Sequence, residues 1–323
     1  MVTRAVLAAA LLSGIVWRAA ADEALPKITV SYSQQVGDEL PLFVTQDGGY
    51  FKKNGLDATV TLLPAQTGIP ALLNGQVQFS SIGAGDALSA AAQGLHVKYV
   101  AAFAPVYVFG LWVRPEYASA EKLRGQKVAV ASFTGTAYLA TVLELRQLGL
   151  APGDVVITPL GSAQNTAAAL MAGSIAATSS LPPITYEFEK RGFVKLVDLM
   201  PKRIPNLTAG LLALDSYVAS HHQIVQEAVD AFSQGLQRDK TDKAFAEQVI
   251  AGRLAVKGEA AVGQTYDLYR ASIAQDWPMP EPGMLESAQS ILGLQNAKIK
   301  TVDVNALIDR SFVTDAMARM SGK

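Results

Sequence analysis

Apolar runs alternate with helical segments through the first two thirds of the chain. Runs rich in β-branched residues predict strands at 27–33, 57–63, 77–82, 97–104, 127–132, 155–160, 175–180 and 193–199. Helices are predicted between them at 41–54, 69–73, 87–93, 137–148 and 166–171. Strands that alternate with short helices are typical of parallel βαβ units, so the pattern predicts an α/β fold.

The strand and helix pattern occurs twice, once before residue 105 and once after it. With an offset of 98 residues, seven positions of the segment 62–81 are identical, and among them Gly75 aligns with Gly173 and Ser81 with Ser179. Common ancestry and a shared strand–helix–strand geometry both explain such a match. Either explanation gives two lobes of similar α/β architecture.

Two extended segments, 105–115 and 206–214, are expected to cross between the lobes. Beyond them an apolar stripe predicts a helix, formed by Val225, Val229, Phe232 and Leu236. Further helices are expected at 259–275, 283–292 and 304–320, packed around the first lobe. The predicted domains are 22–108 together with 210–323 for the first lobe, and 109–209 for the second.

Residues 1–21 have the features of a secretory signal. Arg4 precedes an apolar run of 12 residues from Ala5 to Val16, and Ala19 to Ala21 form a small-residue cleavage site. This run is too short to span a bilayer, which needs about 20 residues. We therefore expect a soluble periplasmic protein after cleavage at Ala21; an uncleaved N-terminal helix is the alternative.

Composition excludes several classes of function. The chain has 27 basic and 28 acidic residues, so it lacks the basic surplus with which proteins neutralise nucleic-acid phosphates. It has no cysteine and three histidines, which excludes disulfides, thiolate metal sites and a cysteine nucleophile. Neither an HExxH nor a GxSxG motif occurs. No nucleic-acid partner, metal or cofactor is expected, and a binding protein is favoured over an enzyme.

Four segments resemble a known family: PLFVTQDGGYFKKNGLDATV (41–60), ALLNGQVQFSSIG (71–83), LRGQKVAV (123–130) and FTGTAYLATVLELRQLGLAPGDV (133–155). They are similar to the nitrate, sulfonate, taurine and thiamine-pyrimidine branch of the periplasmic solute-binding proteins of ABC importers. The resemblance implies the type II periplasmic binding protein fold, with two α/β lobes, two crossing strands and a ligand cleft between the lobes. It also implies a small-molecule ligand, an ABC permease as partner and a monomeric chain.

The chain departs from the family pattern in two respects. Gln78 and Ala176 stand where the family often has Asp, which leaves the subfamily open. The thiamine-pyrimidine synthases that share this fold depend on cysteine and histidine motifs that are missing here, so the resemblance implies binding rather than catalysis.

The expected cleft residues follow from the strand ends. In open α/β sheets ligands bind beyond the carboxyl ends of the strands, near helix N-termini. Four loops meet this rule, and their candidate ligand-binding residues are Ser33, Gln34, Gln35, Asp38, Gly83, Ala84, Gly85, Asp86, Ser132, Phe133, Thr134, Gly135, Thr136 and Pro182. Possible aromatic walls are Tyr32, Tyr107, Phe109 and Phe133, for which core packing is the alternative.

The loop 132–136 is the strongest anion candidate. Thr134 and Thr136 offer hydroxyl donors, and Gly135 allows a close backbone approach to an oxyanion at a helix N-terminus. An ordinary helix cap is the alternative. The sequence thus predicts a sulfonate-, nitrate- or carboxylate-like solute. Asp38 and Asp86 leave a neutral or cationic pyrimidine-like vitamin precursor open, and a ligand sensor for a signalling partner is the other alternative to an importer component.

Overall fold

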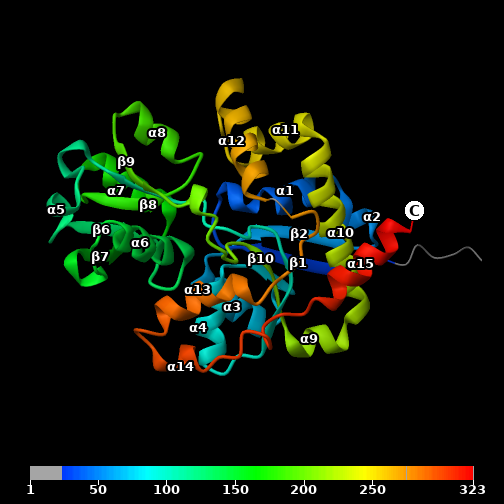
Figure 1. Cartoon of the computed structure of the whole chain (residues 1–323). Coiled ribbons are helices and arrows are strands. Elements are labelled where there is room, and N and C mark those ends of the chain that lie inside the picture. Colours follow the sequence, from blue (N-terminus) through cyan, green and yellow to red (C-terminus); the bar gives the residue numbers. More distant parts are fainter. Residues whose placement is uncertain (1–23, 274, 323) are drawn as a thin grey trace, which may run out of the picture.

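The computed structural model describes residues 24–273 and 275–322, so the predicted signal at 1–21 lies outside the described residues. The chain forms two α/β lobes that lie side by side (Figure 1). Each lobe is built on one five-stranded sheet, in the order β2-β1-β3-β10-β4 in lobe 1 and β7-β6-β8-β5-β9 in lobe 2. The predicted α/β class and two-lobed architecture are therefore confirmed.

Lobe 1 contains the first strands of the chain and one late strand. Its strands are β1 (Lys27–Tyr32), β2 (Asp57–Leu62), β3 (Phe79–Ser81), β4 (Val97–Ala102) and β10 (Gly210–Leu214). The strand β1 pairs in parallel with β2 and β3, while β10 lies antiparallel between β3 and β4. The helices that follow these strands are α1 (Leu40–Asp47), α2 (Tyr50–Lys53), α3 (Ala65–Leu73) and α4 (Ala84–Ala92).

Lobe 2 repeats this topology. Its strands are β5 (Gly110–Val113), β6 (Lys127–Val130), β7 (Val156–Pro159), β8 (Ala177–Ser180) and β9 (Val194–Asp198). The strands β6, β7, β8 and β9 run in one direction, and β5 is antiparallel between β8 and β9, in the place that β10 has in lobe 1. The helices of this lobe are α5 (Ala120–Leu123), α6 (Thr136–Gln147), α7 (Ala163–Ala172) and α8 (Thr185–Lys190).

The two crossing segments begin earlier in the chain than predicted, and they pair with each other. The strands β5 and β10 belong to the sheets, which leaves residues 103–109 and 199–209 as the crossings. These run antiparallel: Phe103 N donates to Ala209 O (3.1 Å), Asn206 N to Pro105 O (2.9 Å), and Thr208 N to Ala104 O (2.9 Å). The connection between the lobes is therefore a two-stranded ladder.

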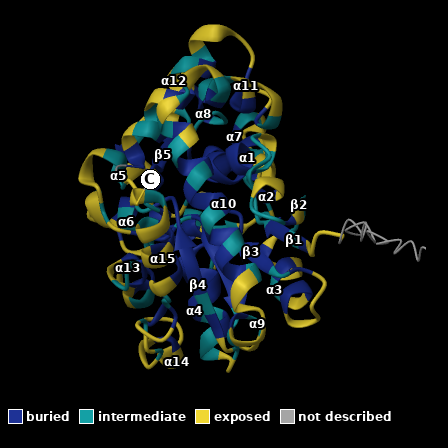
Figure 2. Ribbon diagram, turned by 90° about the vertical axis from the view of Figure 1, so that its right-hand side faces the viewer, coloured by how far each residue is buried: buried dark blue, intermediate teal, exposed yellow. Residues whose placement is uncertain are grey.

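Among the residues that the structure describes, seven helices follow β10: α9 (Asp215–Ser220), α10 (His222–Thr241), α11 (Lys243–Arg253), α12 (Glu259–Ser272), α13 (Gly283–Leu292), α14 (Ala297–Lys300) and α15 (Ser311–Ser321). The predicted apolar stripe of α10 is fully buried, and this helix contacts α1, α2 and β4 of lobe 1. Figure 2 shows β3 and β4 of lobe 1 buried, while the outer faces of α11 and α14 are exposed. Most of these helices cover lobe 1.

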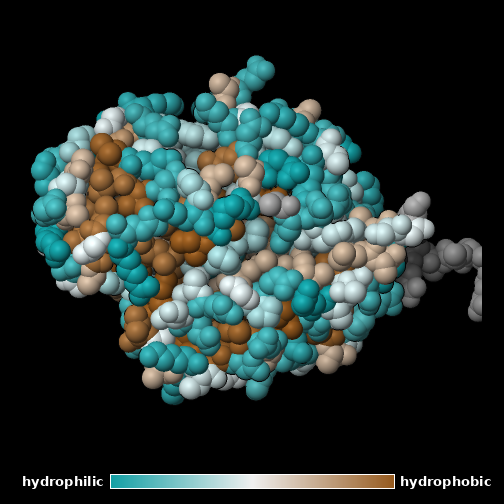
Figure 3. Space-filling view, in the orientation of Figure 1, coloured by the Kyte–Doolittle hydropathy of each residue, from teal (hydrophilic) through white to brown (hydrophobic). Residues whose placement is uncertain are grey.

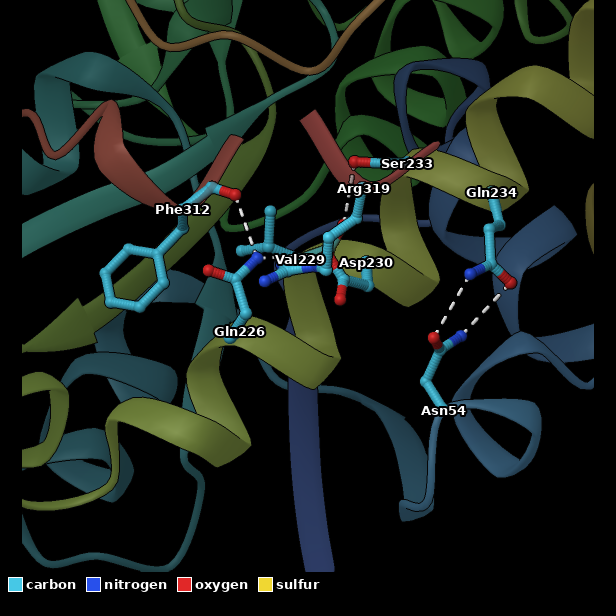
Figure 4. A network of polar contacts seen from close by, with 8 residues as sticks. All are labelled: Asn54, Gln226, Val229, Asp230, Ser233, Gln234, Phe312 and Arg319. Carbon is cyan, nitrogen blue, oxygen red and sulfur yellow. Dashed lines mark hydrogen bonds and ion pairs between the residues drawn. The ribbon is translucent and has the colours of Figure 1, made fainter. Parts of the chain in front are cut away.

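Polar side chains fix α10 to its neighbours (Figure 4). The amides of Asn54 and Gln234 exchange two hydrogen bonds of 3.1 Å. On the other side, Gln226 donates to the Phe312 carbonyl (2.9 Å) and Arg319 pairs with Asp230 (2.8 Å). The last helix, α15, is thereby tied to α10.

Three element predictions need correction. The predicted helix 41–54 is two helices, because Gly49 adopts a left-handed φ of 67° that breaks it. The predicted helix 304–320 begins only at Ser311, after irregular turns. The helices α12 and α13 also reach lobe 2, so the C-terminal helices do not serve lobe 1 alone.

Apolar and hydrophilic residues are distributed unevenly over the surface of the two lobes. In the view of Figure 3, apolar surface gathers over lobe 2 and toward its junction with lobe 1, whereas hydrophilic residues dominate the face formed by the C-terminal helices. Within the described part of the chain, none of the helices combines the length and the apolarity needed to cross a bilayer.

Candidate functional site

A cavity lies between the lobes, at the carboxyl ends of the parallel strands of both sheets. It has a volume of about 60 Å³, and residues from both lobes and from the crossing segments line it. The polar side chains of its lining are those of Ser33, Gln34, Asp38, Glu39, Gln66, Asp86, Ser132, Thr136, Thr166, Ser179, Ser180 and Thr208. The cavity is where the strand-end rule places a ligand, and such a position is typical of ligand clefts in α/β proteins.

Lobe 1 supplies two adjacent carboxyl groups. A short 3₁₀ turn, Gly37–Glu39, leads into α1 and buries Asp38 and Glu39 so that each is 3% exposed. The Ser81 hydroxyl donates to Glu39 Oε2 (2.7 Å). No side chain within residues 24–273 and 275–322 donates a hydrogen bond to the Asp38 carboxyl group. Burial raises the pKa of Asp38 to about 7 and that of Glu39 well above its ordinary value.

A third carboxyl group, that of Asp86, stands in the first turn of α4. The Thr134 hydroxyl of lobe 2 donates to Asp86 Oδ1 (2.6 Å), so this bond joins the two lobes. Burial raises the pKa of Asp86 to about 6, and the bond from Thr134 opposes that rise. None of the described residues that line the cavity is Lys, Arg or His. Lobe 1 therefore makes one wall acidic without a compensating cation.

Lobe 2 supplies hydroxyl groups. Ser179 donates to Glu144 Oε1 (3.1 Å), and Thr166 donates to the Ala163 carbonyl (2.9 Å). Ser132 accepts a bond from Gly135 N (2.9 Å) in the turn that precedes α6. Ser180 is 3% exposed, and its buried Oγ has no hydrogen-bond partner in the described part of the chain.

Glu144 lies behind this wall, outside the cavity. It is fully buried in α6, and its second carboxyl oxygen has no partner among the described residues. Burial raises the pKa of Glu144 to about 8, with the Ser179 bond opposing the rise. At neutral pH this carboxyl group is mostly protonated, which adds no charge to lobe 2.

The lobes touch on both sides of the cavity. On one side Gly83 and Gly85 of the α4 start meet lobe 2: a Cβ on Gly83 would lie 2.6 Å from Thr136 Oγ1, and one on Gly85 would collide with the Thr134 carbonyl oxygen. On the other side the Tyr269 hydroxyl of α12 donates to the Pro182 carbonyl (2.6 Å). The structure is therefore a closed state, and the two glycines allow this close approach.

Eight of the fourteen predicted site residues line the cavity: Ser33, Gln34, Asp38, Gly83, Asp86, Ser132, Gly135 and Thr136. The others have structural partners. The Gln35 amide bonds to the Arg253 carbonyl, and Ala84 N donates to Leu207 O (2.8 Å). Phe133 is 45% exposed and packs against Tyr138. Gly85, Thr134 and Pro182 form the contacts between lobes described above, so the Thr134 hydroxyl is engaged by Asp86.

Six polar residues of the lining were not predicted from the sequence: Glu39, Gln66, Thr166, Ser179, Ser180 and Thr208. Two of these carried a usable signal, because Ser179 and Ser180 end the predicted strand 175–180 and thus meet the strand-end rule. Of the proposed aromatic walls only Phe109 lines the cavity; Tyr107 is buried and bonds to Ser287 (3.1 Å). Glu39 carried no signal, since it lies among the residues that begin a helix.

The family model described as NMT1/THI5 like matches residues 37–241. The chain belongs to this family. The match covers most of both sheets and all of the crossing segments. It confirms the resemblance found in the sequence.

Solved structures of low identity share the fold. They include the putative periplasmic sulfonate-binding protein SsuA of Methylobacillus flagellatus KT (19% identity, TM-score 0.73, 93% of this chain and 96% of that one). The periplasmic nitrate-binding protein NrtA of Synechocystis PCC 6803 is also similar (13% identity, TM-score 0.74, 93% of this chain and 90% of that one). The CA3427 gene product of Candida albicans, described as having the generic periplasmic binding protein fold, is similar as well (16% identity, TM-score 0.69, 88% of this chain and 97% of that one). A search of curated protein sequences found no match.

Proposed function

We propose that this NMT1/THI5-like chain is the extracytoplasmic solute-binding component of an ABC importer. The observation that carries the proposal is the closed polar cavity between the two lobes. In the described part of the chain, a short paired ladder connects the lobes, and the other contacts between them would break on separation. Such an arrangement suits closure about a hinge around a small solute. The sulfonate- and nitrate-binding relatives support the same role.

Binding rather than turnover is supported by the chemistry of the cavity. A catalytic site needs a nucleophile beside a base. Two serine–glutamate pairs come nearest to this, Ser81 with Glu39 and Ser179 with Glu144. Burial raises the pKa of Glu144 to about 8 and that of Glu39 well above its ordinary value. A protonated carboxyl group is a poor proton acceptor, so both pairs are better explained as structural hydrogen bonds.

The anion predicted from the sequence fits only one wall. The start of α6, with Thr136 and Ala137, faces the cavity and offers the backbone donors that suit an oxyanion. The opposite wall carries Asp38, Glu39 and Asp86, which would repel a second negative charge. A solute with hydrogen-bond donors satisfies this wall, so the neutral or cationic alternative gains support.

Small-angle scattering combined with thermal unfolding tests the binding function. The chain, refolded from urea to remove carried-over solutes, is measured with and without a protein-free metabolite extract. Binding should raise the melting temperature by mass action and shift the scattering profile toward the compact closed form. An extract that changes neither quantity at any concentration tried would contradict the proposal.

Cellular placement and partner need separate measurements. We propose export and cleavage after Ala21, giving a monomer in the periplasm; the intact mass of the exported protein tests this, and a mature chain that retains residues 1–21 contradicts it. A neighbouring gene pair for a permease and an ATPase supports the importer, whereas a sensor kinase gene would favour the signalling alternative.

A further inference from the structure

The cavity between the lobes offers many hydrogen-bond acceptors. Each of Glu39 and Asp86 receives one hydroxyl bond from the protein, from Ser81 and Thr134, which leaves its other carboxyl oxygen free of a side-chain donor among the described residues. Asp38 receives none from the described part of the chain, although it is 3% exposed and lines the cavity. Lobe 1 thus presents carboxyl oxygens that need donors.

The hydroxyl groups of lobe 2 add to this excess. The proton of Ser179 points at Glu144 and that of Thr166 at the Ala163 carbonyl, so both oxygens present lone pairs to the cavity. Ser180 gives an independent indication that a ligand binds here. Its Oγ is buried in the lining and has no hydrogen bond to the described residues. A buried polar atom without a partner destabilises the structure, so a ligand atom that bonds to Ser180 Oγ removes this cost.

We propose that the solute carries a protonated nitrogen, an ammonium or amidinium group, which binds at the carboxylates of Asp38 and Glu39. This inference rests on the proposed solute-binding function and names the charge class of the solute. The group supplies several N–H donors and the positive charge that the lining lacks. The remainder of the solute then reaches the hydroxyl wall of lobe 2.

Electrostatics support this choice. Burial raises the pKa of Asp38 to about 7, which shows how costly an uncompensated charge is at this position. A cation nearby favours the ionised form and recovers that cost, while a sulfonate or nitrate in a cavity of about 60 Å³ would lie close to the same carboxyl groups. The electrostatic free energy at these carboxyl groups therefore favours binding of a cation and opposes binding of an anion.

Thermal unfolding with two matched series of probes tests the charge class. The cations are ethylammonium, ethanolammonium and acetamidinium, and the anions are nitrate, methanesulfonate and acetate, all at equal ionic strength. The variants are Asp38→Asn, Glu39→Gln and, as a control, Asp57→Asn, whose carboxyl group is exposed on β2. We expect a cation to raise the melting temperature of the wild type and of the control, and a loss of at least tenfold in its affinity in both cleft variants.

Asp38→Asn has a second expected signature. It removes the buried ionisable group, so the ligand-free variant should melt higher than the wild type at pH 8 while it loses the cation response. An anion that stabilises the wild type and Asp38→Asn alike would overturn the inference, and so would a cation series without effect. If the metabolite extract still stabilises the chain in these cases, the solute-binding function stands and only the charge class is wrong.

Discussion

The two walls of the cavity are built on the same topology but carry different chemistry. In each lobe a serine at the end of the third parallel strand, Ser81 in β3 and Ser179 in β8, donates to a buried glutamate. In lobe 1 the glutamate, Glu39, lies between the serine and the cavity; in lobe 2 the serine lies in front and Glu144 is behind it. The same bond thus exposes a carboxyl group on one wall and a hydroxyl group on the other.

This difference shows how a repeated scaffold can hold an unsymmetrical solute. The two serines align in the sequence at the offset of 98 residues, so the shared part belongs to the scaffold. The position of the glutamate, at the start of α1 or in the body of α6, decides which group faces the ligand. In the proposed binding mode, lobe 1 recognises the charge of the solute and lobe 2 supplies neutral hydrogen-bonding groups.

The largest expected effect comes from holding the two walls apart. In Gly85→Val the new side chain collides with the Thr134 carbonyl, a backbone atom that cannot move aside cheaply. We expect a larger radius of gyration and a loss of solute affinity of about 100-fold or more, since binding needs both walls. Scattering and calorimetry measure these. Gly252→Ala, at a helix position with open space, is the control; equal affinity in both variants would contradict closure at Gly85.

Removing the bond between the walls should have the next largest effect. Thr134→Val keeps the shape but leaves Asp86 without its donor, which costs about 1–3 kcal/mol of the closed state. Solute affinity should fall roughly ten- to 100-fold by calorimetry. Thr241→Val, which removes an exposed hydroxyl bonded to its own helix, is the matched control. A variant with unchanged affinity would mean that the Asp86 bond does not hold the cavity closed.

The pH dependence of stability should report the titration of the buried carboxyl groups of lobe 1, with Asp38 as the group that a variant can remove. Asp38 and Asp86 have folded-state pKa values of about 7 and about 6, above their unfolded value of 3.8, so the folded chain binds more protons between these limits. The contribution of these groups to stability is full below about pH 4 and is lost as pH rises through 6 to 7. Urea unfolding of the ligand-free chain at pH 5 and pH 8 should show it, with a smaller difference in Asp38→Asn. An unchanged pH difference in Asp38→Asn would show that Asp38 does not titrate as described.

The smallest expected effect separates the two serines. Ser81→Ala and Ser179→Ala each remove one bond to a buried glutamate and should cost about 1 kcal/mol of unfolding free energy. Only Ser81→Ala frees an oxygen of a carboxyl group that lines the cavity, that of Glu39. We therefore expect Ser81→Ala to change cation affinity more than Ser179→Ala does, although the two variants lose similar stability. Chemical unfolding and calorimetry on both variants measure this; identical changes in affinity would remove the distinction between the walls.

The sequence predicts the fold better than the site. Alternation of apolar runs and short helices identifies nearly every strand, because parallel strands buried on both faces carry continuous apolar runs. The break at Gly49 was missed because a glycine inside a helical pattern is often tolerated, and only its left-handed φ of 67° shows the break. The irregular turns before Ser311 were missed for a similar reason: their composition continues a helical pattern.

The sequence does not reveal hydrogen-bond partners that are distant along the chain. The loop 132–136 was predicted as an anion site, and the structure shows that the Thr134 hydroxyl bonds to Asp86, 48 residues away and in the other lobe. A local pattern cannot reveal that partner. Glu39 was missed for the same reason, because its neighbour Ser81 comes close only when β3 is added to the sheet beside β1.

The order of strands in the two sheets has a consequence for how the chain folds. All five strands of lobe 2 lie in one continuous stretch, 110–198, so this lobe has every strand of its sheet once that stretch is made. In lobe 1, β4 reaches the sheet only through β10, which comes more than 100 residues after it. Such a distant pairing is slow to form. We therefore expect lobe 2 to reach its native structure first, and the sheet of lobe 1 to be completed later, when β10 pairs with β3 and β4.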